Sequence, residues 1–241
     1  DITNTQIHVF SDASKLGVGA VAYVRTEYDN GKIESKLLMA RGAIVPNPQP
    51  TIPRLELTAA VLGSQVGKFA RKPLEILSEN VHFWTDSTCV AGWIRAPHKA
   101  LSIFVANRTE AIQKSSKIDN WQHIAGVENP ADISSRGATL DELRTSNLWN
   151  EGPDFLGKDI SEWPTRVVPN VPTEVLDEVK KDTLKDNPEL WDHPDVLISL
   201  RINRVAEGDL QLGLERYSTW TKAKRIVKYL LDWRRQWKEP R

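Results

Sequence analysis

Apolar and polar positions alternate at the start of the chain and predict three strands. Residues 6–10 form a short β-rich run, residues 18–25 a second run after a Lys-Leu-Gly turn, and residues 34–45 a third after an Asp-Asn-Gly turn. The prolines within 46–50 end the third run, because proline supplies no donor to a strand ladder. The pattern therefore predicts a hairpin that a third antiparallel strand extends.

The spacing of apolar residues then becomes helical. From Leu55 to Phe69 they recur three and four positions apart, and Pro53 stands where a first helical turn tolerates proline. The pattern next predicts a strand, two helices, a strand and a helix, at residues 81–85, 87–94, 102–114, 121–125 and from Ala131 onward. Strands joined by such crossovers run parallel to a neighbour. We expect an α/β fold in which a mixed five-stranded sheet carries helices on its faces.

Periodicity weakens after the first two thirds of the chain and predicts three parts. Residues 1–165 form the predicted domain, which has an ordinary domain size. Residues 166–199 combine many charges with weak periodicity, which is typical of a linker. Residues 200–241 are expected to be a mostly helical extension, with Ser218 as the N-cap of its last helix.

Composition narrows the class of protein. The chain has 32 basic and 32 acidic residues, so any attraction to nucleic acid must come from local patches. Cys89 is the single cysteine, which excludes a disulfide within the chain and favours the cytosol or nucleus. No stretch approaches the length of an apolar membrane span. Because the chain begins without methionine and runs almost at once into a strand, we expect a piece of a longer polypeptide.

Acidic residues stand at the ends of predicted elements. Asp12 directly follows the first strand and Asp86 the fourth, while Glu56 lies in the first turn of a helix and Asp132 opens another. Open α/β sheets place their ligand crevice at strand ends, so we expect these four acids to converge. Taken singly, such an acid more often caps a helix or complements its dipole.

Four carboxylates suit a pair of divalent ions. Magnesium prefers hard oxygen ligands and is usually held by one or two protein carboxylates, so the predicted cofactors are two Mg²⁺ or Mn²⁺ ions. Two ions roughly 4 Å apart activate a water against a phosphodiester and stabilise the departing 3′ oxygen. Without metal the four charges would repel one another.

Four sequence blocks carry a specific resemblance. The sequence resembles the ribonuclease H domain of BEL/Pao-type LTR retrotransposon polyproteins in blocks FSDAS, IPRLEL, WTDST and NPADISSRG, at residues 10–14, 52–57, 84–88 and 129–137. The resemblance extends from residue 6 to about residue 165, through the Trp-Pro pair at its end. Each block alone is a weak signal, but four in the same order form a specific one.

The resemblance implies a fold, a site and a reaction. It implies a ribonuclease H-like sheet, with Asp12, Glu56, Asp86 and Asp132 as metal-binding catalytic acids. The reaction would be internal cleavage of the RNA strand of RNA/DNA hybrids during reverse transcription. Its expected partners are the reverse transcriptase and integrase parts of the same polyprotein, with residues 200–241 leading toward integrase. The expected location is a cytoplasmic virus-like particle, with the nucleus as the alternative.

One departure from the wider family concerns a histidine. Cellular ribonucleases H carry a histidine in the loop before the last acid, whereas the loop 126–130 has none. His123 lies upstream on a predicted strand, where a local hydrogen bond is a more ordinary role than catalysis. Slower turnover, or a contribution from Glu128 in this loop, are the two alternatives.

Residues near the acids are candidates for substrate contact. A tryptophan can stack on bases and basic side chains can meet phosphates, although packing and a solvated helix face are the commoner roles. The candidates are Ser14, Ser87, Trp93, Arg108 and Arg136.

Other functions compete with the nuclease. A catalytically inactive ribonuclease H-fold connector or nucleic-acid-binding module would keep the same fold. An aspartic protease is disfavoured because no glycine follows Thr85-Asp86-Ser87-Thr88 as such a site requires. An integrase core shares the sheet but has a different order of acids.

Overall fold

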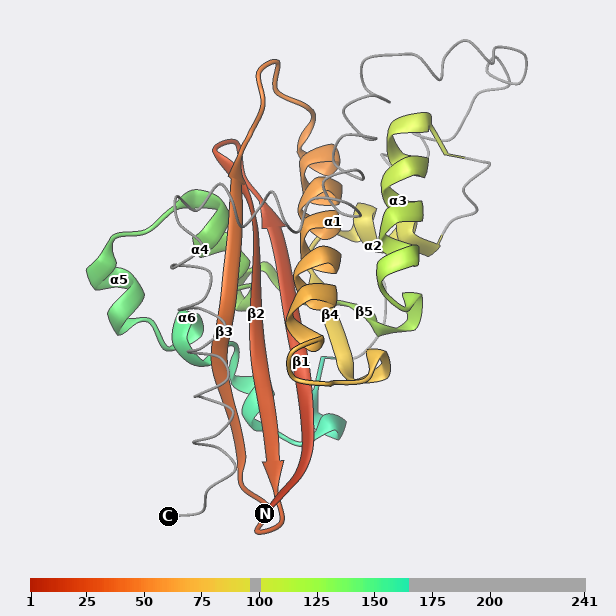
Figure 1. Ribbon diagram of the computed structural model, residues 1–241. Coiled ribbons are helices and arrows are strands. Elements are labelled where there is room, and N and C mark those ends of the chain that lie inside the picture. Colours follow the sequence, from red (N-terminus) through yellow and green to blue (C-terminus); the bar gives the residue numbers. More distant parts are fainter. Residues whose placement is uncertain (96–100, 165–241) are drawn as a thin grey trace. The chain divides into compact units, whose positions relative to one another are not determined.

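A mixed five-stranded sheet organises the computed structural model, which describes residues 1–95 and 101–164 (Figure 1). Its strand order is β3-β2-β1-β4-β5. β1 pairs antiparallel with β2 and β2 with β3, whereas β4 runs parallel to both β1 and β5. The strands are β1 (Ile2–Ala13), β2 (Gly17–Tyr28), β3 (Ile33–Ile44), β4 (Val81–Thr85) and β5 (Trp121–His123). The mixed sheet expected from the sequence is confirmed.

The helices follow the expected order. Within the described residues they are α1 (Ile52–Arg71), α2 (Thr88–Arg95), α3 (Ile103–Ser115), α4 (Ala131–Arg136), α5 (Leu140–Thr145) and α6 (Asn147–Glu151). The first two strands are longer than predicted, because the hairpin pairing continues through polar residues outside the apolar core of each run, whereas β3 has the predicted length. This extension changes where one candidate acid lies.

Helix α1 covers one face of the sheet. Two of its glycines permit close approach: a Cβ at Gly63 would lie 3.3 Å from the Ser11 Cβ, and one at Gly67 would lie 2.7 Å from the Phe83 ring. Successive side chains of a strand point to opposite faces, so β1 presents Val9 and Ser11 to α1 and its intervening residues to the other side. α1 also packs against α3.

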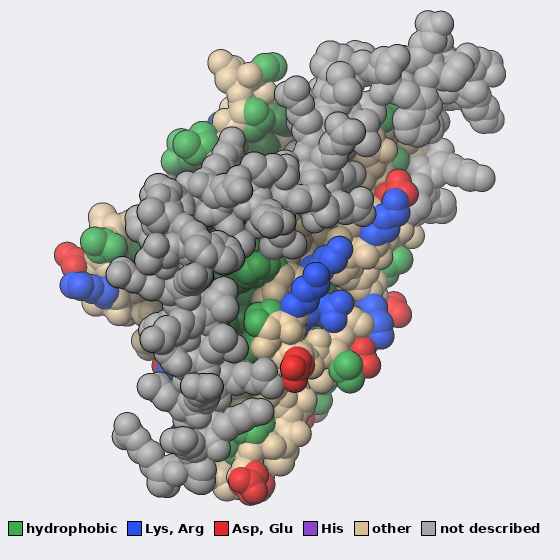
Figure 2. Space-filling model, viewed as in Figure 1, with side chains coloured by type: hydrophobic (Ala, Val, Ile, Leu, Met, Phe, Trp, Pro, Cys, Tyr) green, Lys and Arg blue, Asp and Glu red, His purple; other side chains and the backbone are tan. Residues whose placement is uncertain are grey.

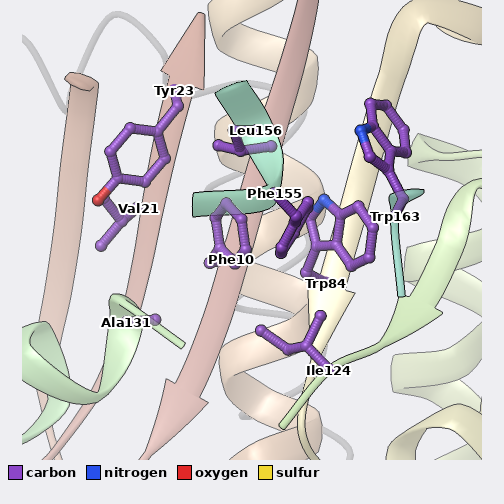
Figure 3. Packing of buried hydrophobic residues seen from close by; sticks show 9 residues of the cluster. All are labelled: Phe10, Val21, Tyr23, Trp84, Ile124, Ala131, Phe155, Leu156 and Trp163. Carbon is purple, nitrogen blue, oxygen red and sulfur yellow. The ribbon is translucent and has the colours of Figure 1, made fainter. Parts of the chain in front are cut away.

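An aromatic cluster covers the opposite face. Phe10 and Trp84 stack with their ring centroids 6.0 Å apart, and Phe155 and Trp163 close over them from a later part of the chain (Figure 3). These two residues follow α6, in or beside two short 3₁₀ turns at Asp154–Gly157 and Ile160–Glu162. The last described segment is therefore part of the core.

A buried arginine ties this segment to the sheet. Arg25 on β2 is 1% exposed, and its guanidinium donates to the backbone oxygens of Leu156, at 2.8 Å, and Lys158, at 2.7 Å. Buried cationic donors need such partners, because an unpaired buried charge is costly. The sheet and the C-terminal turns are thus joined by charge-assisted hydrogen bonds as well as by apolar packing.

Other expectations meet the structure in different ways. Cys89 is buried. Among the helices of residues 1–95 and 101–164, none has the length and apolar character needed to cross a membrane. The predicted linker, residues 166–199, and the predicted extension, residues 200–241, lie outside the described residues, so the proposed division of the chain stays a prediction.

Candidate active site

Asp12 and Asp86 lie side by side at one end of the sheet. Asp12 is within β1, one residue before the strand ends, which corrects the expectation that it follows the strand. Asp86 directly follows β4, as expected. The parallel pairing of β1 with β4 sets Ser11 opposite Thr85, so one further step in the same register sets Asp12 opposite Asp86.

Glu56 reaches this sheet end from α1. Because α1 begins at Ile52, Glu56 lies beyond the first turn, which contains no acid, and not inside it as expected. The pKa of Glu56 is raised to about 7, mostly by burial and also by the charges of Asp86 and Asp12, while a hydrogen bond with Ser87 lowers it. Glu56 therefore belongs to the same electrostatic cluster as the two strand-end acids.

Asp86 is perturbed in the same direction. Its pKa is raised to about 6, mostly by burial and also by the charge of Asp12. A hydrogen bond with the Asn129 side chain and the charge of His123 act in the opposite direction. Three carboxylates from β1, α1 and the end of β4 thus form one group, which we call the acid cluster: Asp12, Glu56 and Asp86.

Helix α4 holds Asp12 in place. Ser135 is 2% exposed and its hydroxyl donates to Asp12 Oδ2 at 2.5 Å. The Ser14 hydroxyl donates to the backbone oxygen of Ser135 at 2.7 Å. A Cβ on Gly19 would lie 2.8 Å from the side chain of Ser134, so glycine is what lets α4 approach β2 this closely.

The fourth candidate acid has a different partner. Asp132 lies in the first turn of α4, as expected, and accepts a hydrogen bond from Arg136 Nε at 2.6 Å. This ion pair is exposed, with the Asp132 side chain 41% and the Arg136 side chain 67% accessible. Asp132 is thus bonded to a cation on its own helix.

Helix capping does not account for these acids. The cap of α2 is Ser87, whose hydroxyl accepts from the Val90 backbone nitrogen at 3.1 Å, so Asp86 does not hold that position. The N-cap of α4 is Pro130, and Asp132 lies inside the helix. The commoner structural role weighed for the two aspartates is therefore wrong for both.

His123 supports Asp86 through the backbone. It is the last residue of β5, and its Nε2 lies 3.0 Å from the backbone oxygen of Asp86, which can only accept, so the ring donates. The expectation of a strand residue with a local hydrogen bond is confirmed. On the other side of Asp86, a Cβ on Gly126 would lie 3.0 Å from Asp86 Oδ2.

Asn129 and Ser135 are site residues that sequence reasoning missed. Asn129 is 1% exposed; its amide donates to the Ser11 backbone oxygen at 3.1 Å, and its Oδ1 accepts from the Ala131 backbone nitrogen at 3.1 Å. Both residues belong to the sequence block 129–137, which was selected because it contains Asp132. Their position in that block is the sequence signal that could have identified them. Their roles depend on contacts with β1, which spacing alone does not reveal.

Two substrate-contact candidates are corrected. Trp93 is 1% exposed and Arg108 6% exposed, so neither presents a surface to a nucleic-acid strand. The Arg108 guanidinium carbon lies 3.4 Å from the centroid of Phe104, and its Nε donates to Thr58 Oγ1 at 3.3 Å. Arg108 thus joins α3 to α1, because Thr58 lies on α1.

The three remaining candidates differ in what they touch. Ser14 joins β1 to α4 and Ser87 caps α2, so both have structural hydrogen bonds close to the acids. Arg136 is largely exposed beside Asp132. Among the three, Arg136 has the accessibility that contact with a phosphate requires.

A basic surface lies elsewhere. Figure 2 shows Lys and Arg side chains gathered over the face that carries α1 and α3. On α3, Lys114 pairs with Glu110 at 2.7 Å, and shortly after this helix Lys117 pairs with Glu79 at 3.6 Å. Acidic partners reduce the positive charge of this surface.

The carboxylates of the acid cluster suit a metal ion that keeps part of its water shell. Within residues 1–95 and 101–164, no three or more His, Cys, Asp or Glu side chains are arranged to hold one ion. Magnesium does not require such a cage, because it keeps several waters and takes one or two protein carboxylates. The carboxylates of the acid cluster are hard oxygen donors that repel one another, and magnesium ions that keep several waters fit such a group.

Comparison with known families bears on the same residues. Residues 1–87 match the family model of the Pao retrotransposon-like RNaseH-like domain. The matched segment contains the whole acid cluster and confirms the resemblance over these residues, whereas Asp132 lies beyond it. The predicted lead-in to integrase is also outside this match. No curated protein matches the chain by sequence.

Solved structures similar to the chain include two ribonucleases H. RNase H1 from the archaeon Halobacterium salinarum is 10% identical, with 53% of this chain and 89% of that chain covered and a TM-score of 0.33. The N-terminal RNase H domain of Rv2228c from Mycobacterium tuberculosis is 9% identical, with 55% and 95% covered and a TM-score of 0.33. RuvC from Thermus thermophilus is 10% identical, with 68% and 87% covered and a TM-score of 0.27.

Proposed function

We propose that this chain is a ribonuclease H of a retroelement polyprotein, which hydrolyses the RNA strand of RNA/DNA hybrids with two Mg²⁺ or Mn²⁺ ions. The observation that carries the proposal is the acid cluster, three carboxylates brought from three elements to one sheet end. Such a group opposes folding, because each charge is desolvated and repelled by the others. Its presence points to a function that needs cations.

The residues of the chain have distinct roles in this proposal. Asp12 and Asp86 are the central ligands, with Glu56 reaching them from α1 and Asp132 from α4. When bound, the ions supply activation of a water and stabilisation of the leaving 3′ oxygen. Ser135 orients the Asp12 carboxylate, and Asn129 and His123 hold Asp86.

Protonation links the acids to neutral pH. With pKa values of about 7 for Glu56 and about 6 for Asp86, both groups release protons in the range where a nuclease of the cytosol would work. Ligands must be deprotonated to bind metal, so metal binding here releases protons and strengthens as pH rises.

The setting follows from the family resemblance. In this proposal the reverse transcriptase and integrase parts of the same polyprotein are the partners, and the hybrid is the intermediate of reverse transcription. The location is a cytoplasmic virus-like particle, with the nucleus as the alternative.

A cleavage assay tests the function. The full chain is incubated with Mg²⁺ or Mn²⁺ and a labelled RNA/DNA hybrid, beside single-stranded RNA and duplex DNA of the same sequence. We expect internal cleavage of the RNA strand of the hybrid, leaving 3′ hydroxyl and 5′ phosphate ends. Asp86→Asn should lower the rate by about a hundredfold or more, as removal of one charge-stabilising group commonly does. The matched control is Asp154→Asn, an exposed acid outside the cluster.

The outcomes separate the two functions. Hybrid binding without cleavage by the parent chain would favour the inactive nucleic-acid-binding module. Equal cleavage by the parent and Asp86→Asn would refute the proposed site. Cleavage lost in Asp86→Asn and kept in Asp154→Asn supports the nuclease.

A further inference from the structure

Arg136 occupies the place of a counter-ion at the fourth acid. Its Nε donates to Asp132 Oδ1 at 2.6 Å across one turn of α4. The hydrogen bond to Asp132 and its charge raise the pKa of Arg136, and the charges of Asp12 and Asp86 in the acid cluster act in the same direction. A guanidinium on α4 thus stands within the electrostatic field of the group that is proposed to bind metal.

The contact is built to be released at low cost. The Arg136 side chain is 67% accessible and the Asp132 side chain 41%. Exposed ion pairs are weak, since water solvates both charges after they separate. By contrast, Asp12 is held by the buried hydroxyl of Ser135. Asp132 is therefore the acid whose present partner can be exchanged.

A metal ion at Asp132 competes with Arg136 in two ways. The ion needs a carboxylate oxygen, and Arg136 now occupies Oδ1. The positive charge of the guanidinium also repels an approaching cation. After release, the guanidinium remains tethered one helical turn from Asp132.

We propose that Arg136 is an exchangeable counter-cation: it pairs with Asp132 before metal binds, and when metal takes Asp132 it transfers to a phosphate of the substrate strand. The proposal rests on the nuclease function, because it places the phosphate next to the proposed metal site. Arginine suits this exchange, since its planar guanidinium forms paired hydrogen bonds equally with carboxylates and with phosphates.

The first test measures metal binding without nucleic acid. Mn²⁺ is titrated calorimetrically into the parent chain, Arg136→Gln and Arg144→Gln, which removes an exposed charge from α5. Arg136→Gln should bind Mn²⁺ about two- to fivefold more tightly, the factor that an exposed ion pair is worth. Arg144→Gln should bind it as the parent does.

A double-mutant cycle locates the effect at the ion pair. In an Asp132→Asn background, Arg136→Gln should no longer raise the affinity for Mn²⁺, because the carboxylate for which Arg136 and the metal compete is absent. An equal gain in both backgrounds would mean that Arg136 acts as a general charge, and this would overturn the proposal. Thermal unfolding confirms that each variant is folded.

The second test measures transfer to a phosphate. Hybrid binding is followed by fluorescence anisotropy with Ca²⁺ replacing Mg²⁺, and a gel checks that the RNA strand stays intact. Arg136→Gln should weaken binding and reduce the slope of log affinity against log salt by about 0.9, the value for one phosphate contact. If Arg136→Gln has the same salt slope as the parent chain, Arg136 does not transfer to a phosphate. If it has the same Mn²⁺ affinity as the parent chain, Arg136 does not exchange with metal at Asp132.

The two proposals fail in different ways. If Arg136→Gln changes Mn²⁺ and hybrid binding as expected but the parent chain does not cleave, the nuclease function fails and the exchange of partners stands. Cleavage by the parent chain together with equal Mn²⁺ affinity of Arg136→Gln would remove the exchange alone. Absence of Mn²⁺ binding by the parent chain would overturn both.

Discussion

Each acid of the site is controlled by a different neighbouring side chain. Ser135 fixes Asp12, Ser87 bonds Glu56, and Asn129 bonds Asp86, while Arg136 pairs with the exposed Asp132. Hydrogen bonds that favour the charged form oppose burial, which favours the neutral form. At Glu56 and Asp86 burial is the larger effect, so their pKa values lie above the ordinary range.

The raised pKa of Glu56 makes a prediction about stability. Its folded-state pKa of about 7 exceeds the ordinary value of 4.5, so without metal the folded chain binds the extra proton between these values and loses stability as pH rises through 7. Glu56→Gln removes this loss. In EDTA, the variant should gain stability relative to the parent, on the order of 2 kcal/mol between about pH 5 and about pH 8. Urea unfolding at several pH values measures this difference.

Glu162→Gln is the control for that series, because Glu162 is exposed and outside the cluster. It should run parallel to the parent at every pH. A constant difference between Glu56→Gln and the parent would contradict the assignment of Glu56 to a desolvated cluster.

His123 is expected to matter less than the acids. His123→Ala removes one hydrogen bond to the Asp86 backbone, worth about 1 kcal/mol, so cleavage should fall by about fivefold. Steady-state cleavage of the hybrid, with Asp86→Asn as the reference for full loss, measures this. A loss in His123→Ala as large as that in Asp86→Asn would assign the ring a direct catalytic role.

At the scale of elements, the sequence predicted the order of strands and helices and placed Asp86 and Asp132 at the correct element ends. Periodicity reports which residues are apolar, but it does not report which helix covers which face. Arg108 looked like part of a solvated helix face, yet α3 packs against α1 and buries it, and its Nε donates to Thr58 Oγ1 on α1. Long-range hydrogen bonds such as Asn129 to Ser11 are equally invisible to spacing.

The contact between α4 and the β1–β2 hairpin sets the distance of Asp132 from the cluster. Gly19→Ala places a Cβ 2.8 Å from the Ser134 side chain, so α4 must shift outward. We expect a loss of about 1–3 kcal/mol in unfolding free energy, as overpacking usually costs, together with weaker Mn²⁺ binding. Gly157→Ala, which meets nothing within 4 Å, is the control and should change neither quantity. A neutral Gly19→Ala would show that α4 adapts freely.

At the scale of the whole described domain, one face of the sheet is covered by a core that combines residues from the N-terminal and C-terminal parts of the described residues. The aromatic cluster takes Phe10 from β1 and Trp163 from the last turns, and Arg25 bonds the backbone of those turns. The sheet face opposite α1 would otherwise leave large aromatic rings in water, which costs about 25 cal/mol for each Å² of apolar surface. The C-terminal turns therefore contribute to the stability of the sheet that carries the acids.

Substitution within these turns tests their contribution. Leu156 is fully buried, so Leu156→Ala should lower the unfolding free energy by about 2–5 kcal/mol, the usual cost of such a cavity. Leu140 is 76% exposed, and Leu140→Ala should change it by less than about 0.5 kcal/mol. Urea unfolding of both variants gives the comparison. Similar values for the two would mean that the turns pack loosely on the sheet.

The parallel pairing of β1 with β4 has a consequence during synthesis. Translation proceeds toward the C-terminus, so β1 and β2 leave the ribosome before β4 and can pair as a hairpin. Asp12 then lacks Asp86, and still later Ser135, because these residues are translated afterwards. The aromatic cluster on the sheet is complete only when Trp163 has emerged. We therefore expect the proposed metal site to become complete only after the whole domain has left the ribosome.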